Sequence, residues 1–277
     1  MPMNTRVINN YARLKPSLFY LPILLLIAMV LWLYSRDALS ADKYIQVQKD
    51  AFFFINFHLG QFPKTIYNLT QIGDASVFLA FLSIFILYAP KMWEALLSAS
   101  LLSLIFSNVL KNIFGVARPA VVFDNNSFII IGNKAVGQAS LPSGHSITVF
   151  TTLTVLMFAF MPEKLQYKIL WVSFIIITGL MIAFTRVGVG AHYPLDVITG
   201  SIIGYISGLI GIFISREFKI WAWINNPKYY PVLMVLMLVC CISLISGMIN
   251  ENLVIYYLAI ASLFFAFYKI IYVFVKK

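Results

Sequence analysis

Residues 230–247 read Tyr-Pro-Val-Leu-Met-Val-Leu-Met-Leu-Val-Cys-Cys-Ile-Ser-Leu-Ile-Ser-Gly and carry no charged side chain. An apolar stretch of about 18 residues or more is long enough for a helix to cross the hydrocarbon region of a bilayer. Cys240 and Cys241 are adjacent, whereas structural disulfides join distant segments and metal ligands are spaced apart, so we interpret both as small buried residues. The stretch predicts a transmembrane helix.

Similar apolar runs recur along the chain and bring the predicted number of transmembrane helices to about eight. The other runs cover residues 17–34, 66–89, 95–114, 147–161, 169–185, 197–215 and 253–275. The run at 147–161 reaches spanning length if its helix begins at Ser143. The 277 residues are 61% hydrophobic and 11% charged, whereas soluble domains carry about 25% charged residues. The predicted fold class is therefore all-α, a polytopic membrane helix bundle that forms a single membrane domain over residues 1–277.

The first run has two possible interpretations. Arg6, Arg13 and Lys15 precede it and small residues follow at 38–41, as in a cleaved signal peptide. Its length exceeds the apolar core of about 7–15 residues that signal peptides have, which favours a retained membrane anchor.

Charge indicates the orientation, because lysine and arginine gather in short cytoplasmic loops. With the N-terminus inside, the inner segments hold Arg6, Arg13, Lys15, Lys91, Lys164, Lys168, Arg216, Lys219, Lys228, Lys276 and Lys277, and the outer ones hold Arg36, Lys43, Lys49, Lys64, Lys111, Arg118, Lys134 and Arg186. Three of the outer residues, Lys111, Arg118 and Arg186, belong to polar clusters with a possible functional role, and without them the inner segments hold a clear excess of positive charge. Both termini are predicted to be cytoplasmic. The same bias accounts for the net charge of +10, and no basic cluster is dense enough to bind nucleic acid.

The segment between the first two runs, residues 37–63, holds five phenylalanines among charged residues. It fits an amphipathic helix at the outer membrane surface. It fits an ordinary connecting loop with aromatic anchors equally well.

Polar groups are expensive near membrane spans and call for an explanation. Lys111 and Arg118 are seven residues apart and share a helix face if the helix persists; two cations there suit a dianionic ligand. Pro142-Ser143-Gly144-His145 has the form of a helix start, with Ser143 as N-cap and a free anion site at the first amides. Each motif alone also fits a structural role, as snorkelling cations or a capped helix.

The third polar cluster runs from Arg186 to Asp196. His192 and Asp196 are four residues apart, which places them on one helix face. A carboxylate bonded to one ring nitrogen fixes the tautomer and leaves the other nitrogen free to attack. The intervening Val-Gly-Val-Gly lets Arg186 return to the same place. A His–Asp pair that caps a helix is the structural alternative.

In the predicted topology these three clusters meet at the outer ends of spans three to six. One carboxylate and three cations favour an anion over a metal ion, so we predict no metal and no cofactor.

Together the clusters resemble the type 2 phosphatidic acid phosphatase family. Its signature is Lys-x6-Arg-Pro, then Pro-Ser-Gly-His, then Ser-Arg-x5-His-x3-Asp, and this chain matches it at residues 111–119, 142–145 and 186–196. The one departure is Thr185 in place of the signature serine, which keeps the hydroxyl. The resemblance covers about residues 66–215 as a six-helix phosphatase core and leaves residues 230–275 as an additional C-terminal helix pair.

The resemblance implies a role for each matching residue. His192 would attack phosphorus and form a phosphohistidine, Asp196 would orient it, and His145 would protonate the leaving oxygen. The phosphate oxygens would be held by Lys111, Arg118, Ser143, Gly144 and Arg186. The implied function is a metal-independent lipid phosphate or diphosphate phosphatase at the outer face of a bacterial cytoplasmic membrane, with an active site facing the periplasm or exterior.

Several alternatives stay open at this stage. A phosphotransferase would pass the phosphate to a lipid acceptor such as lipid A instead of water. The site also resembles that of vanadate-dependent haloperoxidases, although such enzymes are not multi-span membrane proteins. A carrier or channel for anionic lipids would place polar groups across the bilayer, not at one face. Candidate substrates are undecaprenyl diphosphate, phosphatidylglycerophosphate, phosphatidic acid and lipid A phosphates. The loop at 120–141 is a candidate for head-group selection, and the sequence does not predict the oligomeric state.

Overall fold

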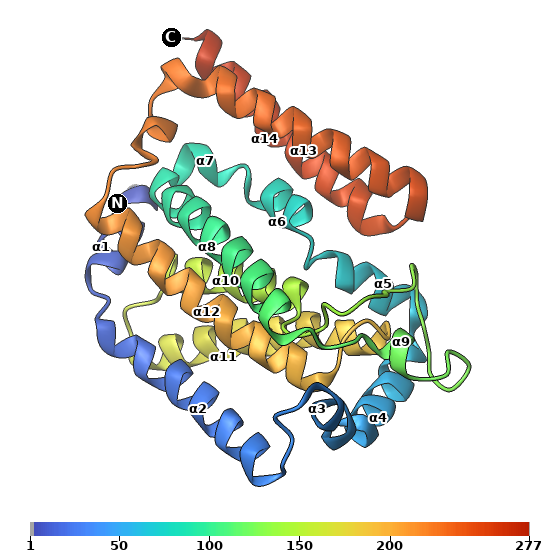
Figure 1. Ribbon diagram of the computed structural model, residues 1–277. Coiled ribbons are helices and arrows are strands. Elements are labelled where there is room, and N and C mark those ends of the chain that lie inside the picture. The colour runs from blue at the N-terminus through green and yellow to red at the C-terminus, as the bar shows by residue number, and fades with distance from the viewer. Residues whose placement is uncertain (1–2, 277) are drawn as a thin grey trace.

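The computed structural model describes residues 3–276, and this part of the chain is helical without strands (Figure 1). The predicted single domain also includes residues 1, 2 and 277, which lie outside the described range. The helices are α1 (Met3–Ala12), α2 (Tyr20–Ser35), α3 (Ala41–Val47), α4 (Lys49–Gly60), α5 (Pro63–Gln71), α6 (Ala75–Leu82), α7 (Phe85–Tyr88), α8 (Pro90–Phe114), α9 (Pro119–Val122), α10 (Gly144–Ala159), α11 (Leu165–Gly188), α12 (Pro194–Glu217), α13 (Tyr230–Glu251) and α14 (Val254–Val275). Short 3-10 turns at Pro16–Phe19, Ala222–Asn225 and Pro227–Tyr229 join some of them.

Within the described range, six segments are long and apolar enough to cross a membrane. They are Pro16–Ser35, Pro90–Val122, Leu165–Gly188, Pro194–Glu217, Pro227–Glu251 and Val254–Val275. The expected polytopic membrane helix bundle is confirmed. Two of the eight predicted spans differ from a simple long helix, and both differences have local causes.

The first difference is the predicted span at residues 66–89, which is not one helix. It consists of α5, α6 and α7, separated by breaks. Asp74 starts α6 as its N-cap, because its side chain accepts a hydrogen bond of 2.7 Å from the amide of Ser76. The Ser83 hydroxyl bonds to the carbonyl of Ala80, and Trp93 Nε1 donates to the carbonyl of Leu82 at 3.0 Å. Side chains therefore satisfy the backbone groups that the breaks release.

The second difference is the length of α10. It begins at Gly144 with Ser143 as N-cap, as predicted, but ends at Ala159 after 16 residues. At 1.5 Å per residue it is about 24 Å long, less than the hydrocarbon thickness of a typical bilayer. α1, which the sequence did not predict, covers its far end: Asn10 Nδ2 donates to the carbonyls of Ala159 at 3.0 Å and Met161 at 3.2 Å.

The core of the bundle is α10, enclosed by α8, α11 and α12. The contact between α10 and α12 is close because α12 presents glycine to it. A Cβ on Gly204 would lie only 2.4 Å from the carbonyl oxygen of Ile147, and one on Gly211 would lie 2.5 Å from the Cβ of Ala99 in α8. Small residues let membrane helices approach closely, and here they bring the starts of α10 and α12 side by side.

Residues 37–63 form the helices α3 and α4 and not an ordinary loop. These two helices lie across one end of the bundle (Figure 1). Phe52 is fully buried and its ring contacts Phe123, Phe128 and Tyr193. Asn56, also buried, donates to the carbonyls of Ile129, Val187 and Gly188 at 2.9–3.1 Å. The segment thus holds the loop at 120–141 against the end of α11.

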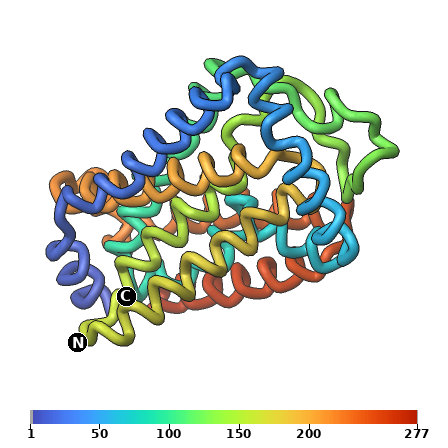
Figure 2. Tube along the Cα trace, turned by 90° about the horizontal axis from the view of Figure 1, so that it is seen from below, coloured from blue at the N-terminus to red at the C-terminus, as the bar shows by residue number. Residues whose placement is uncertain are grey.

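The ends of the bundle differ in what they carry. Both termini of the described chain lie at one end, whereas α3, α4, α5 and α9 lie at the other (Figures 1 and 2). α13 and α14 form a hairpin that packs against α5 and α6. The turn of this hairpin lies at the end that holds α5.

Candidate active site

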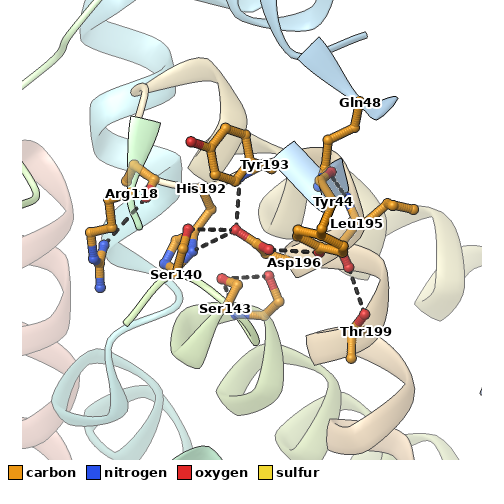
Figure 3. A network of polar contacts seen from close by, with 12 residues as sticks. Tyr44, Gln48, Arg118, Ser140, Ser143, His192, Tyr193, Leu195, Asp196 and Thr199 are labelled. Carbon is orange, nitrogen blue, oxygen red and sulfur yellow. Dashed lines mark hydrogen bonds and ion pairs between the residues drawn. The ribbon is translucent and has the colours of Figure 1, made fainter. Parts of the chain in front are cut away.

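His192 and Asp196 form a buried pair at the start of α12. Nδ1 of His192 lies 3.4 Å from Oδ2 of Asp196, and their side chains are 2% and 0% exposed (Figure 3). The two residues do not share a helix face as predicted, because α12 begins at Pro194 and His192 lies in the preceding turn. That turn folds back so that the amides of Ala191 and His192 donate to the carbonyl of Arg186. The chain therefore places His192 beside Arg186.

Other donors fix the Asp196 carboxylate. Its Oδ2 accepts hydrogen bonds from the Ser140 hydroxyl at 2.6 Å and the Tyr193 amide at 2.9 Å, and its Oδ1 accepts one from the Tyr44 hydroxyl at 2.8 Å (Figure 3). Burial, with the Asp196 charge next, raises the pKa of Tyr44 well above its usual value. The phenol therefore keeps the proton that it donates.

Sequence reasoning missed both Ser140 and Tyr44. Ser140 stands only two residues before the Pro142-Ser143-Gly144-His145 motif, so proximity was the one available signal. Tyr44 lies in the segment of uncertain structure before α4, and nothing in its neighbourhood indicated this contact. Gln48, one turn after Tyr44, accepts a hydrogen bond of 2.9 Å from the amide of Leu195 and so satisfies the start of α12.

The buried position of His192 governs its protonation. Burial, with the charges of Arg118 and Arg186, lowers the pKa of His192 to about 4, and this outweighs the opposing effect of Asp196. The imidazole is therefore neutral at physiological pH. With Nδ1 turned to the carboxylate, Nε2 is the nitrogen left for chemistry.

Lys111 and Arg118 reach the site by different routes. α8 ends at Phe114, and Gly115 closes it in the left-handed conformation at φ 54°. The helix does not persist to Arg118, so the condition for a shared helix face is not met. Arg118 instead lies in the following loop, where its amide donates to Gly137 and its Nη1 donates to the carbonyl of Ala191 at 3.3 Å.

The helix start at residues 143–145 lies against the end of α8. A Cβ on Gly144 would be 3.3 Å from Nζ of Lys111, so glycine leaves room for the lysine ammonium beside the helix start. The amide of Ser143 donates to the carbonyl of Asp196 at 3.0 Å, which joins the starts of α10 and α12. His145, in the first turn of α10, packs against Gly73, where a Cβ would lie 3.0 Å from the His145 ring.

Arg186, in the last turn of α11, is held on one side only. Its Nη1 donates to the Thr70 hydroxyl at 3.0 Å, while its buried Nε has no hydrogen-bond partner in the described chain. A buried guanidinium nitrogen without a hydrogen-bond partner costs free energy, and a ligand that accepts its hydrogen bond removes this cost. Thr185, the departure from the family signature, turns its hydroxyl to the carbonyl of Ile182 and not toward the site.

These residues form one electropositive cluster. His145 lies within electrostatic reach of Arg186, His192, Lys111 and Arg118, and Lys111 within reach of Arg118, Arg186 and Asp196. Residues 3–276 contain no group of three or more His, Cys, Asp or Glu side chains arranged to hold a metal ion. Three cations, free helix-start amides and a neutral buried imidazole make an arrangement that can bind a phosphate group and attack it.

Comparison with known proteins points in the same direction. The model of the PAP2 superfamily matches residues 91–220. An undecaprenyl-diphosphatase of Sulfolobus acidocaldarius is 24% identical over 67% of this chain and 86% of its own length. A lipid A 1-phosphatase of Rhizobium etli is 35% identical over 47% of this chain. The match covers about half, 53%, of that relative's own length.

A solved structure shares the fold. The crystal structure of Aquifex aeolicus LpxE superposes with a TM-score of 0.50 at 26% identity, covering 60% of this chain and 95% of that one. The matched residues 91–220 contain all three polar clusters and the helices α8, α10, α11 and α12 that carry them. The protein is an integral membrane protein, and residues 91–220 of its chain match the PAP2 superfamily.

Proposed function

We propose that this protein is a lipid phosphatase that removes phosphate from a lipid phosphate or diphosphate through a phosphohistidine on His192. The observation that carries the proposal is the buried pair of a neutral His192 imidazole and the Asp196 carboxylate, beside three cationic side chains. The PAP2 match and the lipid phosphatases among its relatives support it.

The cluster suits the binding of a dianionic phosphate. Arg186 offers its unpartnered Nε, and Arg118 and Lys111 add positive charge to the cluster. The Ser143 hydroxyl and the Gly144 amide lie at the positive end of α10, where helix starts bind anions. These groups would hold the three equatorial oxygens, the task that Mg²⁺ performs in kinases. The proposed reaction therefore needs no metal.

The first step is an in-line displacement at phosphorus. Nε2 of His192 forms a bond to phosphorus while the bond from phosphorus to the leaving oxygen breaks. Nδ1 keeps its proton, and Asp196 stabilises the positive charge that develops on the ring. The negative charge of the bound phosphate favours the protonated form of His145. This imidazolium donates its proton to the leaving oxygen, which departs as a lipid alcohol or, from a diphosphate, as a lipid monophosphate, and His145 is left neutral.

The second step returns the enzyme to its starting state. His145, now a base, takes a proton from water, and the water oxygen attacks phosphorus as the P–N bond breaks. Inorganic phosphate leaves and Nε2 regains its lone pair. The same intermediate could pass its phosphate to a lipid hydroxyl, which would make the protein a phosphotransferase.

The substrate and the orientation are parts of the same proposal. Undecaprenyl diphosphate and lipid A phosphates follow from the named relatives, and phosphatidylglycerophosphate and phosphatidic acid fit the same chemistry. With both termini in the cytoplasm, the end of the bundle that carries α3, α5 and α9 faces the periplasm or the exterior. A lipid head group in the outer leaflet would then lie at the level of the site.

The test is phosphate release by the detergent-purified protein from each of these four lipids, with a metal chelator present. Release that survives chelation and is lost in His192→Ala is expected. A matched control is His58→Ala, because His58 is exposed at the end of α4 and lies outside the cluster. Turnover by His192→Ala near the wild-type rate would overturn the mechanism. Release that requires an added lipid acceptor would identify a phosphotransferase instead.

A further inference from the structure

One short helix, α5, lies between the candidate active site and the α13–α14 hairpin. On the site side, the Thr70 hydroxyl accepts the hydrogen bond from Arg186. Gly73, just after the helix, packs directly on the His145 ring. The last turn of α5 and the residues just after it therefore contact two residues of the proposed mechanism.

The other side of α5 is tied to the turn of the hairpin by side-chain hydrogen bonds. Gln71 Nε2 donates to Oε2 of Glu251 at 2.7 Å, and the Tyr256 hydroxyl donates to the same oxygen at 3.0 Å. One turn earlier in α5, Oδ1 of Asn68 accepts from the amide of Ile255 at 3.2 Å. The Glu251 carboxylate thus joins three helices, α5, α13 and α14.

This junction lies close to the charges of the site. Tyr67, in α5, is within electrostatic reach of both Glu251 and Arg186. Glu251 is partly buried, and hydrogen bonds to a charged group are about twice as strong as neutral ones. Tyr67 therefore lies on a short path between the Glu251 carboxylate and the Arg186 guanidinium.

α5 depends on such ties for its placement. It has nine residues, and its N-cap residue Phe62 makes no side-chain cap hydrogen bond. The helical conformation also ends after Gln71, before α6 begins at Ala75. Helices of this length are marginal without tertiary contacts. The hairpin supplies part of these contacts, together with α11 and α4, although α13 and α14 lie outside the matched residues 91–220.

We propose that Glu251 is a positioning residue for the phosphate site, acting through Gln71 and α5 so that Thr70 holds Arg186 in place. The inference rests on the proposed function in that Arg186 is taken to bind the phosphate. It gives the C-terminal helix pair a role in the reaction, in addition to its place in the membrane.

The experiment measures binding of inorganic phosphate to the full-length protein in detergent, from the phosphate-dependent rise of its unfolding midpoint. This readout needs no turnover. Glu251→Ala is expected to weaken phosphate binding about tenfold, and Glu251→Gln, which keeps an acceptor oxygen, about threefold or less.

Two neighbouring tyrosines provide a matched pair of milder variants. Tyr256→Phe removes one hydrogen bond to Glu251 and is expected to weaken phosphate binding about threefold. Tyr257→Phe removes a hydrogen bond of 2.8 Å to Asn252 in the same turn, with no tie to α5, and is expected to leave phosphate binding unchanged. This pair keeps the test decisive if Glu251→Ala does not fold.

A double-mutant cycle tests the route. If Glu251 acts through Thr70, then Glu251→Ala adds little to the loss of affinity that Thr70→Val causes alone. Additive losses, or a Tyr256→Phe protein that binds phosphate like Tyr257→Phe, would overturn the positioning role.

The two proposals fail in distinguishable ways. A wild-type protein that binds phosphate but releases none from any lipid would contradict the proposed function alone. A protein that hydrolyses lipid phosphates while Glu251→Ala binds phosphate normally would contradict only the role of Glu251. A wild-type protein that binds no phosphate would contradict both.

Discussion

Oδ2 of Asp196 lies 3.4 Å from Nδ1 of His192 but only 2.6 Å from the hydroxyl of Ser140. The tighter contact shows that the carboxylate is fixed by groups other than the histidine it faces. With Tyr44 on the second oxygen, Asp196 is held before any substrate arrives. Such a preorganised carboxylate can stabilise positive charge on the imidazole without moving.

Loss of the Ser140 hydroxyl should therefore slow the chemical step. We expect Ser140→Ala to lower kcat about tenfold with little change in KM, because a hydrogen bond to a charged group contributes about 1.5–3 kcal/mol. Steady-state kinetics on the best lipid substrate measures the effect. Ser207→Ala is the control, since Ser207 is equally buried but bonds only to the Ile203 carbonyl within α12. Equal kinetics of the two variants would contradict the role of Ser140.

The protonation of His192 gives a second prediction. Its pKa is lowered to about 4, so the ring should stay neutral as the pH falls through the usual histidine range. The folded state then loses stability between about pH 6.5 and 4, because the unfolded chain binds the proton first. In a protein with His58→Gln and His145→Gln, NMR of the remaining imidazole reports its titration directly. A midpoint near 6.5 would show that burial and the two arginines do not act as described.

Close packing between α10 and α12 leads to a third prediction. A Cβ on Gly200 would lie 2.6 Å from the carbonyl oxygen of Ser143, and one on Gly204 would crowd Ile147 deeper in the bundle. Both Gly200→Ala and Gly204→Ala should destabilise the fold by about 1–3 kcal/mol, the usual effect of overpacking. Only Gly200→Ala should also weaken phosphate binding, because it displaces the helix start at the site. Equal phosphate affinities in the two variants would refute this distinction.

The presence of Thr185 in place of the signature serine should have little effect on the rate of the reaction. Its hydroxyl bonds to the Ile182 carbonyl inside α11 and is buried away from the cluster. Thr185→Ser should therefore keep kcat/KM within about twofold, a change of under about 0.5 kcal/mol. An increase of tenfold or more would mean that the signature serine acts on the phosphate directly.

The sequence predicted the fold class because long uncharged runs have few structural solutions in a bilayer. It failed where side chains interrupt a run. Asp74 and Ser83 divide residues 66–89 into three helices, since their oxygens bond to the backbone locally. α1 went unpredicted because ten residues of mixed polarity give a weak signal.

For the site, the sequence indicated which residues gather but not how they are held. The motif spacing placed Lys111, His145 and His192 at one end of the bundle. It did not predict the local geometry of Arg118, because Gly115 ends α8 before that residue. Tyr44 and Ser140, which donate hydrogen bonds to Asp196, lie 152 and 56 residues from it in the sequence. No local sequence pattern predicts contacts over such separations.

The central claim is that phosphate passes through His192, and trapping the intermediate tests it most directly. The His145→Ala protein would be mixed with an aryl phosphate, whose leaving group needs no proton, quenched rapidly at alkaline pH and digested for mass spectrometry. The account predicts a phosphate on the peptide that carries His192, accumulating because the base for the second step is missing. An unlabelled His192, in a protein that still releases the aryl alcohol, would contradict the account.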